Sequence, residues 1–155
     1  MRPTAPGHPV TAAVLITNPR DQLLIVRPAK DGAAWHLPGG IVEQCESPLD
    51  AARREGREEL GLDLDVKEHD LFAVEWLQAT RPERRDRLAF LFAGPVLHPH
   101  DTDQIVLQRD ELAAWRWATR TEAASLLHPA VAARIVGPLH PGNALYRETR
   151  KEETL

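Results

Sequence analysis

Short apolar runs separated by polar turns make up the first and middle parts of the chain. Residues 10–16 (VTAAVLI) and 22–27 (QLLIVR) are apolar and rich in β-branched side chains, and the turn-like sequence TNPRD lies between them. Two such runs joined by a short polar segment predict a β-hairpin. A second strand pair is expected at 71–76 (LFAVEW) and 87–94 (RLAFLFAG), on either side of the charged loop ATRPERRD.

The remaining apolar positions predict helices and one further strand. Residues 47–60 have helical spacing, whereas residues 112–117 (LAAWRW) alternate as in a strand. Residues 121–136 are expected to form one or two helices, with Pro129 at a boundary. The segment 33–40 (AAWHLPGG) predicts an extended stretch that ends at its proline and two glycines.

Together these elements predict a mixed α/β (α+β) fold, with strands joined largely by hairpins, one helix in the middle and more at the end. The 155 residues are expected to form a single domain, with its core at about residues 9–137. Residues 1–8 are Pro-rich and predict a loose N-terminus. The residues after Pro138 are polar and low in periodicity, and they predict a polar tail outside the core.

Composition narrows the function classes. Hydrophobic residues make up 43% and charged residues 27% of the chain, an ordinary balance for a soluble protein. The formal net charge of −4 argues against a nucleic-acid partner and against an anionic membrane surface. The single cysteine, Cys45, excludes an internal disulfide and fits a reducing compartment. Because no apolar run approaches a membrane span and the N-terminus has no secretory pattern, we expect a cytoplasmic protein without a membrane partner.

The central helix carries its own start and stop signals. Ser47 is a suitable N-cap, Pro48 takes the first helical position, and Asp50 adds negative charge to the first turn. Gly61 supplies the C-terminal stop. One stripe at helical spacing is expected to face the core, and it consists of Leu49, Ala52, Gly56 and Leu60.

Three glutamates, Glu55, Glu58 and Glu59, lie within an arc of about 100° beside this stripe, by helical geometry. Arg54 and Arg57 are expected further round, toward solvent. Like charges at this spacing destabilise a helix by about 0.2–0.5 kcal/mol per pair, so the carboxylates need a partner. Two interpretations are open. One is a site for Mg²⁺ or Mn²⁺, which prefer oxygen ligands, and the other is a solvated face of Arg–Glu pairs.

Adjacent glycines before the helix favour the metal site, because glycine permits close approach of the backbone to a ligand. With Gly39 and Gly40 included, the segment resembles the signature of the Nudix hydrolase family. In that signature a glycine, a glutamate and the sequence Arg-Glu-apolar-any-Glu-Glu-any-Gly-apolar follow one another at fixed spacing. Here Gly40 is followed by five residues and Glu46, and seven more residues lead to REGREELGL at 54–62.

The resemblance covers most of residues 10–137, because WHLPGG, the strands before it and the late WRW segment are also similar to the family. One position departs from the signature, since Gly56 stands where the family has a large apolar residue. A glycine in a helix interior costs about 1 kcal/mol relative to alanine. Because Gly56 lies on the core stripe, it predicts unusually close contact between the helix and the sheet.

The resemblance implies a Nudix fold, a mixed β-sheet sandwiched between α-helices. It also implies a pyrophosphohydrolase, a hydrolase of acid anhydrides that uses Mg²⁺ or Mn²⁺ to cleave the diphosphate of a nucleoside diphosphate linked to a group X. Matching positions give four metal ligands, namely the Gly39 carbonyl, Glu55, Glu58 and Glu59. The same matching implies that Glu46 and Arg54 orient these carboxylates and that Gly40 is a supporting residue of the site.

Hydrolysis needs a base that takes a proton from the attacking water. Glu58 and Glu59 are the first candidates. The family also uses an acid from a downstream loop, and Glu111, or its neighbour Asp110, is the candidate in this chain. Bound cations would bridge the acidic site and the diphosphate, and they would lower the pKa of the water.

The substrate is less closely defined. Motifs similar to those of members specific for NADH, ADP-ribose, diadenosine polyphosphates or CoA are missing. A broad MutT-like group remains, which includes pyrophosphatases of (d)NTPs and oxidised NTPs. Arg27 is a candidate for phosphate contact, and Trp35 and Trp76 are candidates for stacking on a base. The alternative function is a catalytically idle domain that binds a nucleotide as a sensor, and a homodimer is compatible with the sequence.

Two further features have both a structural and a functional interpretation. The loop TRPERRDR at 80–87 is rich in arginine, and it predicts either a solvated hairpin tip or a contact with phosphate or nucleic acid. His36 is next to the glycines in sequence, and it is expected either to pack within a strand or to take part in the site.

Overall fold

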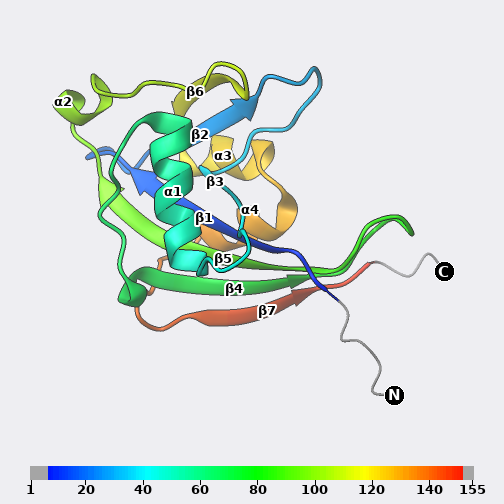
Figure 1. Ribbon diagram of the computed structural model, residues 1–155. Helices are drawn as coiled ribbons and strands as arrows, with labels where there is room; N and C mark the ends of the chain where they lie inside the picture. The colour runs from blue at the N-terminus through cyan, green and yellow to red at the C-terminus, as the bar shows by residue number, and fades with distance from the viewer. Residues whose placement is uncertain (1–6, 152–155) are drawn as a thin grey trace.

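The computed structural model describes residues 7–151 and contains one seven-stranded mixed sheet between helices (Figure 1). The strands are β1 (Val10–Thr17), β2 (Leu23–Pro28), β3 (Gly39–Ile41), β4 (Leu71–Leu77), β5 (Arg87–Val96), β6 (Leu112–Ala118) and β7 (Leu145–Thr149). The helices are α1 (Pro48–Leu60), the 3-10 helix η1 (Glu68–Asp70), α2 (Pro99–Thr102), α3 (Arg120–Leu126) and α4 (Pro129–Ile135). None of the helices in this described part is long and apolar enough to cross a membrane.

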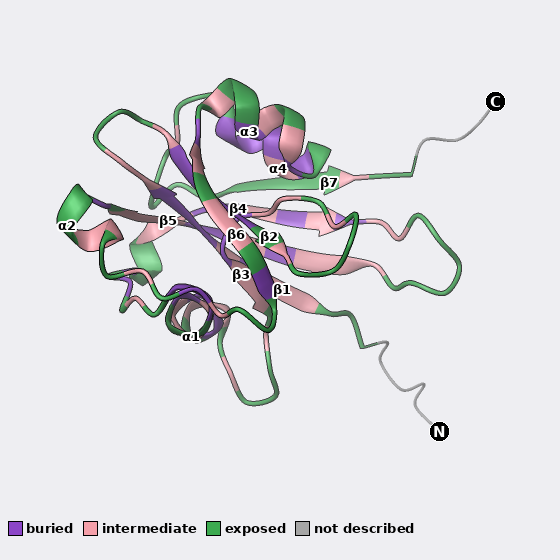
Figure 2. Cartoon of the chain, turned by 90° about the horizontal axis from the view of Figure 1, so that it is seen from above, coloured by how far each residue is buried: buried purple, intermediate pink, exposed green. Residues whose placement is uncertain are grey.

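The sheet has the order β6-β2-β1-β5-β4-β7, and β3 pairs with β1 beside this path. Both expected antiparallel strand pairs are present, β1 with β2 and β4 with β5. The two hairpins are joined by the parallel pairing of β1 with β5 at the centre of the sheet. Helix α1 covers one face and helices α3 and α4 cover the other (Figure 2), so the predicted sandwich is confirmed.

The sequence of strand β2 is continuously apolar because both faces of the strand are buried. Leu23 and Ile25 pack in the core under α3 and α4, whereas Leu24 and Val26 pack in the core under α1. All four side chains are fully buried. A strand with both faces covered needs apolar residues at every position rather than at every second one.

The polar tail predicted after Pro138 is wrong in part, because β7 adds a parallel strand to the sheet. Ala73 of β4 lies opposite Leu145, and Leu77 lies opposite Thr149. Four of the five β7 residues are exposed. An edge strand with both faces open to solvent has no buried face, so its sequence lacks the alternation that signals a strand. The segment at 121–136 forms two helices, and Pro129 opens the second.

Helix α1 has the expected ends. The Ser47 hydroxyl accepts from the Asp50 N–H at 3.1 Å, and Gly61 closes the helix in the left-handed conformation with φ of 68°. The close contact predicted between Gly56 and the sheet is wrong, however. A Cβ at Gly56 would stand 2.5 Å from Cδ1 of Leu64, in the segment that folds back under the helix. Gly56 therefore makes room for this returning segment.

A buried ion pair joins the sheet to α4, and no pattern in the sequence indicated it. Glu75 of β4 is 1% exposed and Arg134 of α4 is 8% exposed, and the guanidinium donates to the carboxylate. A buried carboxylate is costly unless a cation and hydrogen bonds compensate it. The pair therefore fixes how α4 sits on β4.

The Glu75→Leu variant is expected to lower the free energy of unfolding by about 3–5 kcal/mol, because it leaves the Arg134 guanidinium buried without its partner. The double variant Glu75→Leu/Arg134→Met removes both charges and should recover most of the loss. Urea denaturation followed by circular dichroism measures both values. A single variant as stable as the parent would contradict the pair's role.

Candidate active site

A pocket of about 490 Å³ lies between α1, β3 and the start of β6, and carboxylates gather in it. Glu55 and Glu59 enter it from α1, and Glu111 enters from the segment before β6. The other lining residues are Pro28, His36, Gly39, Gly40, Ile41, Glu43 and Leu112. We refer to this hollow as the carboxylate pocket.

Glu59 is the most deeply buried of these carboxylates, at 5% exposed. Its Oε2 accepts a hydrogen bond from the Gly39 N–H at 2.9 Å. The pKa of Glu59 is raised to about 8, mainly by burial and to a lesser extent by the nearby carboxylates of Glu55 and Glu111, against the lowering effect of the Gly39 hydrogen bond. The pocket therefore holds a carboxyl group whose ionised form is disfavoured by burial and by neighbouring carboxylates.

The two glycines of β3 let backbone and carboxylates come together. A Cβ at Gly40 would stand 2.2 Å from Oε1 of Glu55, and a Cβ at Gly39 would stand 2.2 Å from the Ala12 carbonyl oxygen. A side chain at Gly39 would push β3 away from the β1 backbone, and one at Gly40 would displace the Glu55 carboxylate from its place in the pocket. Burial also raises the pKa of Glu55, whose side chain is 14% exposed.

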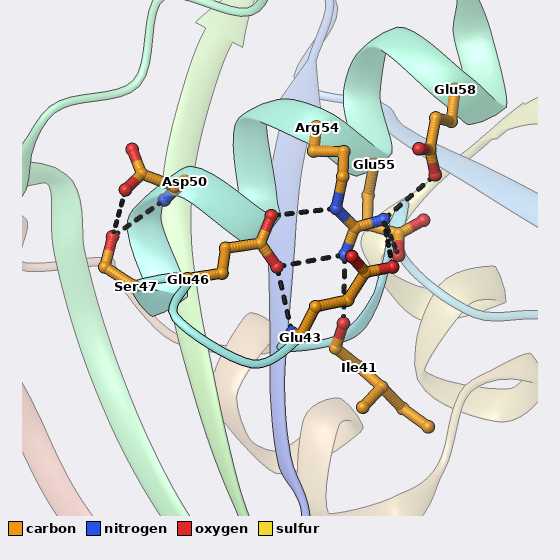
Figure 3. A network of polar contacts seen from close by, with 8 residues as sticks. All are labelled: Ile41, Glu43, Glu46, Ser47, Asp50, Arg54, Glu55 and Glu58. Atoms are coloured by element: carbon orange, nitrogen blue, oxygen red, sulfur yellow. Dashed lines mark hydrogen bonds and ion pairs between the residues drawn. The ribbon is translucent and has the colours of Figure 1, made fainter.

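Arg54 forms the centre of a polar network on the same helix (Figure 3). Its Nε donates to Glu46 at 2.8 Å, and its Nη1 donates to Glu55 and to Glu58, both at 2.9 Å. The hydrogen bonds to Glu46 and Glu55, above all the one to Glu46, raise the pKa of Arg54 above its usual value. The expectation that Arg54 points to solvent is wrong, because its side chain is only 18% exposed.

The network also holds the loop between β3 and α1. The Nη2 of Arg54 donates to the Ile41 carbonyl at 3.0 Å, and Glu46 accepts from the Glu43 N–H at 3.0 Å. The Arg54 hydrogen bond keeps the pKa of Glu46 below its usual value, so this carboxylate stays ionised. Glu46 and Arg54 thus tie three segments of the site together.

The other predicted catalytic acids differ in how they face the pocket. Glu58 is half-exposed, pairs with Arg54 and does not line the carboxylate pocket. Glu111 is exposed and lines the pocket opposite α1, whereas its neighbour Asp110 does not line it. The backbone holds Glu111 in place, since its carbonyl accepts from the Ala29 N–H at 2.8 Å.

Arg27 and Trp35, the two predicted substrate-binding residues, contact each other but do not line the carboxylate pocket. The guanidinium carbon of Arg27 lies 5.4 Å from the Trp35 ring centroid, and that of Arg116 lies 5.9 Å from the same centroid. Trp76 is elsewhere, under the guanidinium of Arg150 at 5.3 Å. Arg27 and Trp35 do not line the pocket themselves, but their chain neighbours Pro28 and His36 do.

His36, one of whose two expected roles was in the site, lines the pocket, and so does Glu43, which was not named as a candidate from the sequence. His36 lines the pocket, makes a 2.7 Å hydrogen bond from Nδ1 to the Leu37 carbonyl, and has a pKa lowered by burial. The carboxylate of Glu43 lies 4.0 Å from Arg54. Its position three residues before Glu46, in the glycine-to-helix loop, was the only available signal.

The residues present fit a hard divalent cation in chemistry. Across residues 7–151, no three Asp, Glu, His or Cys side chains are already grouped as a metal centre. Arg54 holds Glu55 and Glu58, and the Gly39 N–H holds Glu59. The donors around the pocket are nevertheless carboxylate and backbone oxygens, which Mg²⁺ and Mn²⁺ prefer, and a cation would favour the ionised form of Glu59, which burial disfavours.

Comparisons with known proteins agree with this arrangement. The NUDIX domain family model matches residues 7–136. An RNA pyrophosphohydrolase of Rhodospirillum rubrum is 28% identical over 130 residues, which span 75% of each chain. The protein named 8-oxo-dGDP phosphatase NUDT18 of Danio rerio is 45% identical over 51 residues, 32% of this chain and only 16% of that relative.

Solved structures show the same fold at low sequence identity. The MutT protein of Methanosarcina mazei Go1 is 20% identical, with a TM-score of 0.67 and coverage of 83% of this chain and 91% of that one. A NUDIX hydrolase of Nitrosomonas europaea is 18% identical, with a TM-score of 0.69 and coverage of 96% and 82%. With the family match and the shared fold taken together, the chain belongs to the Nudix hydrolase family and is similar to its MutT-like members.

Proposed function

We propose that this enzyme cleaves the diphosphate of a nucleoside diphosphate linked to a group X, with Mg²⁺ or Mn²⁺ held by the Gly39 carbonyl, Glu55, Glu58 and Glu59. One observation carries the proposal: Glu55, Glu59 and Glu111 converge on one pocket in which burial raises the pKa of Glu59 to about 8. Such a pocket gains free energy from a cation, and a bound cation in turn attracts a diphosphate.

A nucleoside triphosphate, canonical or oxidised, is the first candidate substrate. The relatives named as an RNA pyrophosphohydrolase and an 8-oxo-dGDP phosphatase add triphosphorylated RNA and oxidised nucleotides to the substrates to be tested. The idle sensor is the weaker alternative, because all three glutamates of the site are present. The homodimer and the cytoplasmic location stay predictions.

The residues of the site have separate roles in the proposed hydrolysis. When bound, the cations supply positive charge against the diphosphate and make water more acidic. Glu59 is the first candidate for the base that takes the proton of the attacking water, because its carboxylate lies deep in the pocket. Water oxygen bonds to one phosphorus, the bridging P–O bond breaks, and the departing phosphate keeps the electron pair. Arg54 holds Glu55 and Glu58 in place, and Glu111 faces Glu59 across the pocket as the second candidate base.

The Glu59→Gln variant is expected to fold normally and to lose about 10²–10⁴-fold in Mg²⁺-dependent turnover, because the amide cannot accept the proton. Release of phosphate and pyrophosphate from a panel of canonical, oxidised and sugar-linked nucleotides measures it. Glu68→Gln, at an exposed glutamate outside the pocket, is the control and should keep parental turnover. Parental activity in Glu59→Gln would end the assignment, and a folded parent without turnover on the whole panel would favour the sensor.

Mg²⁺ is expected to stabilise the protein more at about pH 8 than at about pH 5.5. The raised pKa of Glu59 means that the metal-free folded state holds a proton up to about pH 8, so its stability falls as the pH rises from about 4.5 through 8. A cation requires the ionised carboxylate and therefore counteracts this loss only toward high pH.

Thermal unfolding with Mg²⁺ and with EDTA, at both pH values, measures this effect. In Glu59→Gln the difference between the two pH values should shrink, because the titrating group is gone. An equal Mg²⁺ shift of the parent at both pH values would contradict the role of Glu59 in holding the cation.

A further inference from the structure

A second hollow, of about 330 Å³, lies between the β4–β5 loop and the end of β7, and cations surround it. Figures 1 and 2 show this loop and the C-terminal end of β7 on the same side of the molecule. Six cationic side chains line the hollow: Arg81, Arg84, Arg85, Arg87, Arg150 and Lys151. Neither Asp nor Glu is among its described lining residues. We call it the basic cavity.

The basic cavity is separate from the carboxylate pocket. Two of its lining residues, Leu77 of β4 and Arg87 of β5, lie opposite each other in the sheet, and its wall includes His128, the N-cap of α4. Helix α4 covers the sheet face opposite α1, whereas the carboxylate pocket lies beside α1 (Figure 2). No described residue lines both hollows. Because the sheet separates them, a small ligand of the basic cavity would not contact the carboxylates.

Arg87 is half-buried in this cavity and has no counter-charge. Its side chain forms no ion pair within residues 7–151, and its buried Nε has no hydrogen-bond acceptor there. Burial of an unpaired charge costs free energy, so buried charges in proteins are usually paired. Burial lowers the pKa of His128 in the cavity wall, and the positive charge of Arg87 lowers it further, against the raising effect of Glu75. Arg87 and His128 are therefore close enough to attract one anion together.

The buried acid on this face, Glu75, is already paired. Glu75 lies two residues before Leu77 in β4, so both side chains point to the α4 face of the sheet. It accepts a hydrogen bond from Arg134, which is 8% exposed. The Nη2 of Arg134 and the Oε2 of Glu75 have no hydrogen-bond partner within the described residues. One carboxylate thus balances only one of the two guanidiniums on this face, and Arg87 is left over.

The β4–β5 loop adds two more unpaired cations. Arg81 and Arg84 are exposed, and their side chains form no ion pair in the described part of the chain. Neither acid of the loop, Glu83 or Asp86, lines the cavity. Asp86 accepts a hydrogen bond from the Ala79 N–H at 2.8 Å, which holds the base of the loop. The loop therefore presents arginines to the cavity without acids to neutralise them.

Other cations of the cavity are partly compensated. Arg150 pairs with Glu148, and Arg85 donates to the Gly7 carbonyl at 2.9 Å. Three guanidiniums therefore remain for a ligand, one half-buried in the sheet and two in the loop.

The chemistry of these groups favours linked phosphates over other anions. A guanidinium matches the oxygens of a phosphate in pairs. A terminal phosphate group carries a charge of about −1.5 to −2 at neutral pH, whereas a carboxylate carries a single charge. The cavity volume of about 330 Å³ has room for more than one phosphate group, since a water molecule in the liquid takes about 30 Å³. Several cations around one small hollow thus suit a compact anion of high charge.

We propose that the basic cavity binds a small anion with at least two linked phosphate groups, held by the guanidiniums of Arg81, Arg84 and Arg87. The Nδ1 of His128 accepts from the Ala130 N–H at 3.2 Å, so the neutral ring carries its proton on Nε2 and adds a donor to the wall. The arginine-rich loop is thereby assigned to phosphate contact rather than to a solvated hairpin tip. The site does not depend on what the carboxylate pocket hydrolyses.

The first experiment compares two double variants that lose the same charge. Arg81→Ala/Arg84→Ala removes two cations of the basic cavity, and Arg20→Ala/Lys30→Ala removes two exposed cations outside it. Inorganic pyrophosphate is titrated into each by calorimetry, in EDTA so that no cation draws the anion into the carboxylate pocket. The parent and the control should bind one pyrophosphate per chain with equal affinity. The cavity variant should bind at least about tenfold more weakly, because it loses hydrogen bonds between charged groups.

The second experiment tests the half-buried guanidinium by thermal unfolding in EDTA. Arg87→Met removes the unpaired charge and keeps an apolar stem, so without an anion it should unfold at the temperature of the parent or above it. Pyrophosphate should raise the unfolding temperature of the parent and leave that of Arg87→Met unchanged. A variant that is destabilised and still responds to pyrophosphate would overturn the part of Arg87 in the site.

The third experiment locates the ligand without any substitution. In EDTA, pyrophosphate should shift the backbone amide resonances of residues 79–87 and 149–151 of the parent. The resonances of Gly39, Gly40 and Glu59 should stay in place. Shifts confined to those three residues would overturn the proposal, because the anion would then be bound in the carboxylate pocket.

Further ligands test the chemical class. A parent that does not bind pyrophosphate, or a cavity variant that binds it like the control, would overturn the site. Sulfate or a tetraglutamate peptide that binds as tightly as pyrophosphate would overturn the assignment to linked phosphates. A nucleoside diphosphate that binds as tightly as pyrophosphate would identify nucleotides as a source of the ligand, and weaker binding would limit the ligand to inorganic oligophosphates. Both results support the phosphate site, and none of these measurements requires turnover, so they are independent of the proposed hydrolysis.

Discussion

The site depends on one guanidinium placed among carboxylates that would otherwise repel one another. Arg54 contacts Glu46, Glu55 and Glu58 and also the Ile41 carbonyl, so it joins α1 to the loop that follows β3. Without such a counter-charge, an acidic cluster in a half-buried pocket would carry a large desolvation cost. The glycines before the loop can then lie against the helix, which brings the Gly39 N–H to Glu59.

Features with fixed local spacing could be predicted from the sequence. The strand pairs, the capped central helix and the glycine-to-glutamate signature all depend on residues a few positions apart, where backbone geometry limits the alternatives. The two-layer covering of the sheet was implied by the resemblance to the Nudix family. The carboxylates of α1 could be placed beside the core stripe for this reason, and the structure has them there.

Features that depend on distant residues meeting could not be predicted. Strand β7 has no buried face, the partner of Glu75 lies on another element far along the chain, and Leu64 meets Gly56 only because the chain folds back after the helix. The burial of Arg54 depends on Glu46, which helical geometry alone does not place. The position of Glu111 opposite α1 likewise follows from the sheet order, which brings β6 beside β2.

Strand β7 has a consequence for how the enzyme could diversify. It pairs with β4 alone and is largely exposed, so its detachment would break few apolar contacts and belongs among the low-energy opening events of the fold. Such fraying would remove Thr149, Arg150 and Lys151 from the hollow that they line together with the β4–β5 loop, and it would leave the glutamates of α1 in place. The sequence of β7 can thus change without disturbing the carboxylates of α1.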